Sequence, residues 1–235
     1  MCACHPGRVK WALEGGVARH PQPCRYAERM QSLQMVHIDE ALLLVDKPAG
    51  LLSVPGRGEE GRINLTAQVQ ADHADALIVH RLDQATSGLM LFARGAAMQR
   101  TLSMAFASRQ VHKRYVAVVM GRVEHTIGRI DAPLLADWPR RPRQRVDLQH
   151  GKPALTHWRV LERHADHTRL ELEPVTGRSH QLRVHLMCIG HPILGDTLYA
   201  PEPQRAQRLL LHATQLSLRH PLHDTPCTWT SAPAF

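Results

Sequence analysis

A short polar block between two apolar runs constrains the fold of this chain more than any other feature. The apolar runs cover residues 77–79 and 89–93, and the block between them, residues 80–88, reads HRLDQATSG. Apolar runs of this length on either side of a polar, glycine-containing segment predict two strands joined by a loop. Asp83 is the only carboxylate of the block. Because loops supported by strands commonly carry functional side chains, Asp83 is the first candidate for a reactive group.

The rest of the patterned sequence contains more predicted strands than helices. Strands are expected at 42–45, at 115–119 and around 170–172, where apolar residues are continuous or alternate with charged ones. Helical spacing of apolar residues predicts an amphipathic helix over 96–109. Neither a βαβ rhythm nor a glycine-rich phosphate loop is present. These patterns predict an α+β fold with a mixed, mostly antiparallel sheet and flanking helices and loops.

A second helix is predicted over 179–189. Leu182 belongs to its apolar face, and Arg178, Gln181 and His185 share the opposite, polar face. Arg178 is therefore expected at the start of the helix, directed into a cleft.

The chain divides into two regions of different character. Residues 1–35 combine prolines and a glycine pair without sustained periodicity, and we expect them to be a mobile extension or the product of a start site assigned too far upstream. Residues 36–235 are patterned throughout and are expected to form one catalytic domain.

The charge of the chain favours a polyanionic partner. Lys plus Arg number 29 and Asp plus Glu number 21, an excess of eight positive charges, which suits nucleic acid. Aromatic residues make up only 4% of the chain, too few for a surface on which many bases stack. The segment 138–145 is predicted to be an irregular, exposed loop that contacts phosphates through Arg140, Arg141, Arg143 and Arg145.

Cysteine usage and hydropathy indicate a cytoplasmic protein. The five cysteines form no CxxC pair, so neither a disulfide framework nor a zinc site is expected. No apolar run is long enough for a secretory signal or a membrane span. We expect no metal, no membrane contact and a monomer.

Three separated motifs resemble those of the RluA-type pseudouridine synthases. The block 80–88 resembles their first motif, residues 113–117 (KRYVA) their tyrosine motif, and residues 176–186 (TGRSHQLRVHL) their arginine–leucine motif. Weaker similarity at 46–51, 151–154 and 190–196 extends the resemblance, in order, from Val36 to the C-terminus.

The resemblance implies conversion of uridine to pseudouridine in RNA, without a cofactor. It assigns Asp83 as the essential aspartate and Tyr115 as the residue that stacks on the uracil. Arg178 is expected to be the counter-ion that keeps Asp83 charged.

Further residues are assigned to RNA binding and base flipping. Arg81 resembles the family arginine that fills the space left by the flipped base. Leu182 resembles the leucine below that base. His80 is grouped with these residues, with a structural hydrogen bond as its alternative role. The short amino-terminal region resembles a subgroup that modifies both a tRNA anticodon stem-loop and 23S rRNA.

Two other classes of function stay open on residues alone. One is a non-catalytic RNA-binding or ribosome-assembly protein on the same fold. In such a protein we expect the acidic and aromatic motif residues to be replaced, but both are present here. An unrelated glycosidase or nuclease would need a second carboxylate or a cluster of acidic metal ligands, and the motifs contain neither.

Overall fold

The computed structural model describes residues 33–235. Within this range ten strands form one sheet in the order β1-β2-β4-β11-β5-β10-β9-β6, with β12 paired to β11 and β3 paired to β4. The strands are β1 (Gln34–Ile38), β2 (Leu42–Lys47), β3 (Ala76–Ile78), β4 (Ser87–Arg94), β5 (His112–Met120), β6 (Ile127–Asp131), β9 (Leu155–Arg163), β10 (His167–Pro174), β11 (Leu211–Arg219) and β12 (Pro226–Thr230). A separate hairpin contains β7 (Leu134–Ala136) and β8 (Gln144–Val146).

The pairing confirms the predicted sheet. The pair β4–β11 is parallel, and the other paired strands in the described range are antiparallel. The predicted strand–loop–strand around residues 80–88 is also confirmed, with β3 before the loop and β4 after it.

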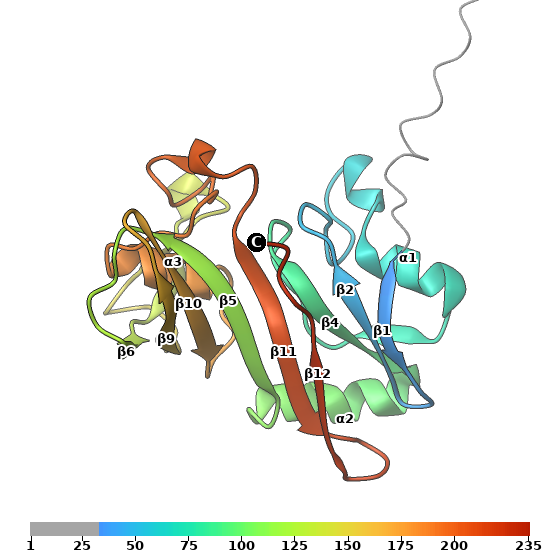
Figure 1. Ribbon diagram of the computed structural model, residues 1–235. Coiled ribbons are helices and arrows are strands. Elements are labelled where there is room, and N and C mark those ends of the chain that lie inside the picture. The colour runs from blue at the N-terminus through green and yellow to red at the C-terminus, as the bar shows by residue number, and fades with distance from the viewer. Residues whose placement is uncertain (1–32) are drawn as a thin grey trace, which may run out of the picture. The chain divides into compact units, whose positions relative to one another are not determined.

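Three α-helices lie in the part of the chain that the structure describes: α1 (Leu65–Asp72), α2 (Gly95–Ala107) and α3 (Gln181–Cys188). Figure 1 shows α2 crossing one end of the central strands, and α3 beside β5 and β10. None of these helices is long and apolar enough to cross a membrane.

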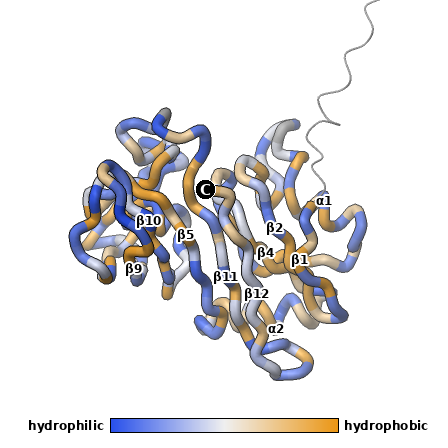
Figure 2. The backbone as a smooth tube through the Cα atoms, viewed as in Figure 1, coloured by the Kyte–Doolittle hydropathy of each residue, from blue (hydrophilic) through white to orange (hydrophobic). Residues whose placement is uncertain are grey.

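Residues 42–45 of β2 and 89–93 of β4 are all apolar because both faces of these segments are covered. Leu42 and Leu91 belong to a core on the side of α2, whereas Leu43 and Phe92 belong to a core on the side of α1. Figure 2 shows hydrophobic residues along these central strands and mostly hydrophilic residues in the outer loops.

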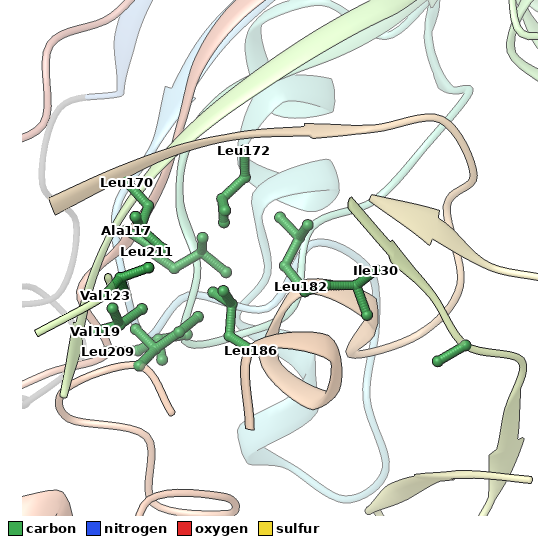
Figure 3. Close-up of a cluster of buried hydrophobic side chains, with 12 residues drawn as sticks. Ala117, Val119, Val123, Ile130, Leu170, Leu172, Leu182, Leu186, Leu209 and Leu211 are labelled. Atoms are coloured by element: carbon green, nitrogen blue, oxygen red, sulfur yellow. The ribbon is translucent and has the colours of Figure 1, made fainter. Parts of the chain in front are cut away.

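A third core joins α3 to the sheet. Leu182 and Leu186 of α3 point towards Leu170 and Leu172 of β10 and Leu211 of β11 (Figure 3). This packing fixes the first turn of α3 beside the start of β5.

The parallel contact between β4 and β11 brings the loop 79–86 to the centre of the molecule. Gly88 has φ +111°, and a Cβ there would lie 2.4 Å from the carbonyl oxygen of Ala213 in β11. Only glycine combines this backbone conformation with so close an approach, so Gly88 permits the contact.

Three local predictions differ from the structure. The helix predicted over 179–189 begins only at Gln181, and its supposed polar face is buried, since Gln181 and His185 are 4% and 0% exposed. The helix α2 ends before Arg109, which has φ 60°. The segment 138–145 is not irregular throughout, because it starts with a 3-10 turn and ends in β8.

The predicted boundary between residues 35 and 36 falls inside β1, which starts at Gln34. The predictions for the extension itself concern mainly residues 1–32, which lie outside the described residues and so stay predictions.

Candidate active site

A pocket opens where the loop 79–86, the start of β5 and the turn before α3 meet. Its volume is about 100 Å³. Five of the residues singled out from the sequence line it: Arg81, Asp83, Tyr115, Arg178 and Leu182. They come from positions up to about a hundred residues apart, and the fold brings them to one place.

Asp83 contacts an arginine of α3. Arg183 Nη1 donates to Asp83 Oδ2 at 3.4 Å, and the other side of the same guanidinium donates to both carboxylate oxygens of Asp196, at 2.7 Å each. The side chains of Arg183 and Asp196 are 5% and 0% exposed, whereas Asp83 is 28% exposed towards the pocket. A bidentate pair of this kind holds the guanidinium plane in one orientation, so Asp196 aims Arg183 at Asp83.

Burial opposes the charge of Arg183, but the hydrogen bonds that it donates to Asp196 and the charges of Asp196 and Asp83 together raise the pKa of its guanidinium. The arginine therefore stays a cation beside Asp83.

The prediction that Arg178 is the counter-ion of Asp83 was wrong. Arg178 is exposed, and its Nε donates to the carbonyl oxygen of Pro153 at 3.1 Å. Because α3 begins two residues later than expected, Arg178 precedes the helix, and the inward-facing position is Arg183. The sequence contained a signal for this, since Arg183 lies in the same motif as Arg178, but spacing alone did not decide between them.

Two buried side chains that sequence reasoning missed fix the backbone around Asp83. Lys47, which is fully buried, donates from Nζ to the carbonyl oxygens of Pro48, Leu51 and Gln84, at 2.8–3.1 Å. On the other side of Asp83, Ser53 Oγ donates to the Leu82 carbonyl at 2.7 Å and accepts from the Leu82 amide at 3.2 Å. The loop is thus held at the residues before and after Asp83.

Replacing Lys47 with methionine is expected to lower the free energy of unfolding by about 2–4 kcal/mol, because buried carbonyl oxygens lose their donor. Burial lowers the pKa of Lys47 to about 7 from 10.5, and the charges of Asp83 and Asp46 oppose part of the shift. Between these values the unfolded chain binds more protons than the folded one, so the contribution of Lys47 to stability increases as pH rises.

Urea unfolding of wild type and Lys47→Met at pH 7 and pH 9.5 measures both effects. The difference in unfolding free energy should be larger at pH 9.5. An equal or smaller difference at the higher pH would contradict the assigned shift.

His80 has a structural place rather than an RNA-binding one. Its Nε2 accepts the Leu91 amide at 2.9 Å, and its ring stacks on Phe106 with 4.6 Å between centroids. Burial and the charge of Lys113 lower the pKa of His80 to about 3, so the ring is neutral and its Nε2 is occupied by the backbone. This geometry does not agree with the prediction that His80 contacts RNA. It agrees with the alternative, in which His80 makes a structural hydrogen bond.

Tyr115 and Leu182 line the interior of the pocket. Tyr115 lies on β5 opposite Leu172 of β10, and burial, with the charge of Asp83, raises the pKa of its hydroxyl. Within residues 33–235 that hydroxyl has no hydrogen-bond partner from the protein. Leu182 is 7% exposed and belongs to the core below.

Arg81 lies exposed at the mouth of the pocket, where its Nη2 is 3.5 Å from Ser179 Oγ. Residues 79–86 belong to no strand, and the loop directs the side chains of both Arg81 and Asp83 to the pocket.

The four arginines of the basic loop divide into two kinds. Arg140 and Arg145 bind loop aspartates, Asp137 and Asp147, at 2.8 and 2.9 Å. Arg141 and Arg143 instead line a second cavity that adjoins the first at Arg81, Asp83 and His180.

The pocket is cationic apart from one acidic side chain. Arg81, Lys113, Arg178 and Arg183 line it, and Asp83 is the only carboxylate among the lining residues. Nowhere in the described range do three His, Cys, Asp or Glu side chains gather as metal ligands. The site therefore suits an anionic substrate and chemistry centred on one carboxylate.

This fold and site define an RNA-modifying enzyme of the pseudouridine synthase class. Residues 41–187 match the RNA pseudouridylate synthase family, and the chain belongs to that family. It is 47% identical over 205 residues to the dual-specificity RNA pseudouridine synthase RluA of Escherichia coli (strain K12), a match that covers 86% of this chain and 93% of the relative. The same protein of Pasteurella multocida (strain Pm70) is 44% identical over 206 residues, covering 86% and 94%.

Solved structures agree with this assignment. The human RNA pseudouridylate synthase domain containing 1 matches with a TM-score of 0.74 and 26% identity, over 87% of this chain and 84% of that chain. The human domain containing 4 matches with a TM-score of 0.69 and 25% identity, over 85% and 88%. The predicted family and fold class are thereby confirmed.

Proposed function

We propose that this protein isomerises specific uridines to pseudouridine in structured RNA, with Asp83 as the essential aspartate. The observation that carries the proposal is the pocket of about 100 Å³ in which Asp83 is the only carboxylate and Tyr115 is the aromatic wall. An enclosed cavity of about 150 Å³ holds one benzene. The pocket around Asp83 is smaller, about 100 Å³, and open to solvent, so it has room for one pyrimidine ring at most.

The reaction breaks the bond between uracil N1 and ribose C1′ and forms a bond between C5 and C1′. One proton leaves C5 and one is gained at N1, so neither an oxidant nor a reductant is consumed. What the protein must supply is an ionised carboxylate near C1′, a surface on which the freed base can turn, and exclusion of water. Asp83, Tyr115 and the buried surface around Leu182 meet these needs.

The positions of the surrounding residues support their roles. Arg183 donates to Asp83 and orients its carboxylate, a positioning role that replaces the one expected of Arg178. Tyr115 stays protonated, because its pKa is raised, and its ring is available to stack on the base. A uridine must leave its helix before Asp83 can reach it, and Arg81 at the pocket mouth is placed to fill the gap. Arg178 is placed to contact a backbone phosphate.

We further propose two substrates, an anticodon stem-loop of tRNA and a stem-loop of 23S rRNA. Support comes from the relatives named dual-specificity synthases, which match almost along their whole length. Such substrates place the activity in the cytoplasm. The alternative of a non-catalytic RNA-binding protein is not favoured, because the acidic and aromatic residues are both retained and share one pocket.

The test uses a transcribed tRNA and a 23S rRNA fragment, each incubated with the purified protein. Pseudouridine is mapped by carbodiimide modification and reverse-transcription stops. We expect one new stop in each RNA. A stop in only one of them would remove the dual specificity, and no stop in any RNA, including total RNA from a deletion strain, would contradict the proposed activity.

A further inference from the structure

A second cavity adjoins the active-site pocket and is larger than it. Its volume is about 450 Å³, and it shares Arg81, Asp83 and His180 with the first. Most of its remaining wall comes from residues 136–144, between β7 and β8, and from Arg57. Because the two cavities share residues around Asp83, a group bound in the second lies directly beside a base bound in the first.

The cavity presents a flat aromatic surface in a chain that has few. Trp138 is 64% exposed, and the guanidinium of Arg141 lies 3.5 Å from the centre of its ring. An exposed indole with a stacked guanidinium is the kind of surface on which a nucleobase stacks.

Among the described residues, no carboxylate pairs with the arginines around this surface. In the part of the chain that the structure describes, Arg57, Arg81, Arg141 and Arg143 line the cavity and form no ion pair with a carboxylate. The two other arginines of the loop, Arg140 and Arg145, each bind an aspartate. Unpaired arginines thus face the cavity, and paired ones lie elsewhere. A ligand with a planar apolar group and at least one negative charge fits this arrangement.

The loop that carries Trp138 is also tied to Asp83. The Gln144 amide donates to the Tyr199 hydroxyl at 2.7 Å, and that hydroxyl lies 2.7 Å from His180 Nδ1. On the other side of the same ring, His180 Nε2 lies 4.0 Å from Asp83 Oδ2. The two cavities are therefore held in a fixed relation.

We propose that the second cavity binds the nucleotide next to the target uridine, with its base stacked on Trp138 and its phosphate held by Arg143 and Arg57. This rests on the proposed function, because it supposes an RNA whose target base occupies the first pocket. Stacking on an aromatic ring tolerates any base. A neighbour held in this way lets one active site accept two RNAs that differ in sequence beside the uridine.

The first test measures the affinity of an anticodon stem-loop RNA in the Asp83→Asn background, so that no conversion occurs. Loss of one stacked base corresponds to about a 5- to 150-fold change in affinity. Trp138→Ala is expected to weaken binding by a factor in this range, and Trp138→Phe should restore most of it. Arg219→Gln, an exposed arginine outside the cavity, is the matched surface control and should bind as the parent does.

The second test removes the base from the RNA. Abasic nucleotides are placed separately on the 5′ and 3′ side of the target uridine. One of the two abasic RNAs should bind the parent protein as weakly as the intact RNA binds the Trp138→Ala variant. The same abasic RNA should bind the Trp138→Ala variant no more weakly than the intact RNA does. The proposal would be overturned if the effects of Trp138→Ala and of the missing base were fully additive at both RNA positions. It would also be overturned if Trp138→Ala bound the intact RNA as tightly as the parent does.

The phosphate contact has its own measurement. Arg143→Gln should reduce the slope of log affinity against log salt by about 0.7–0.9, the value for one lost phosphate contact, whereas Trp138→Ala should leave the slope unchanged. An unchanged slope for Arg143→Gln would remove Arg143 from the site. These measurements need no turnover, so their failure is distinct from failure of the isomerisation itself, which is seen as no product from wild type.

Discussion

Asp83→Asn is expected to lower the rate of pseudouridine formation by at least about a thousandfold, the scale seen when an essential nucleophile or base is removed. Asparagine has the same shape, but it lacks the negative charge that the reaction needs at C1′. Asp83 is the only carboxylate lining the pocket, so no neighbouring acid can replace it.

The variant should fold and bind RNA normally. Asp83 is partly exposed, and its asparagine substitute still accepts from Arg183. The change in unfolding free energy should therefore stay below about 1 kcal/mol. Single-turnover assays with saturating enzyme, together with affinity measurements on the same RNA, separate chemistry from binding.

Gln84→Ala is the matched control for this substitution. Gln84 is the next residue of the loop, is exposed, and donates from its side chain to the Gly50 carbonyl rather than into the pocket. It should retain most of the activity. If Asp83→Asn made product as fast as Gln84→Ala, Asp83 would not be the essential residue.

Arg183→Met is expected to lower the free energy of unfolding by about 3–5 kcal/mol, the cost of leaving a buried charge without its partner. Asp196 is fully buried, and after the substitution it keeps only the backbone amides of Leu198 and Tyr199 as donors. Asp83 also loses its nearest cation, so activity should fall even at temperatures where the variant is folded.

Arg178→Gln is the comparison for Arg183→Met, because the sequence motifs had favoured Arg178 as the partner of Asp83. Arg178 is exposed and makes a single hydrogen bond to a carbonyl, so its loss should cost at most about 1 kcal/mol. Urea unfolding of the two variants gives the comparison. Equal stabilities would mean that the pair between Arg183 and Asp196 contributes little to the fold.

Arg183→Lys separates charge from geometry. Lysine keeps the positive charge but cannot donate to both oxygens of Asp196 and to Asp83 in one plane. We expect partial recovery of stability and less recovery of single-turnover rate. If lysine restored the rate fully, Arg183 would act only as a charge and not as a positioning residue.

Much of the fold could be predicted because the signals were local. The apolar residues before and after the block 80–88 alternate or run continuously in the way that strands require, and β3 and β4 form there. The ends of α3 were less predictable. Gln181 and His185 look like a solvated face, but both are buried with hydrogen bonds to Thr156, and a pattern of polarity does not reveal such partners.

The site was predictable as a set of motifs but not as a set of contacts. Lys47 was part of a motif with similarity to the family, yet its complete burial and its bond to the Gln84 carbonyl depend on how two loops meet. His80 adjoins the reactive segment in sequence, and only packing against Phe106 shows that it supports the sheet.

Motif order and hydrophobic periodicity are properties of the chain, so the family and the strand–loop–strand around Asp83 could be predicted without a structure. The tertiary structure decided which arginine faces Asp83. The contact between Arg183 and Asp83 joins residues 100 apart, and it depends on the residue at which α3 begins and on Asp196 fixing the guanidinium. Side-chain direction across packed elements has no period along the chain, so only the folded molecule distinguishes Arg183 from Arg178.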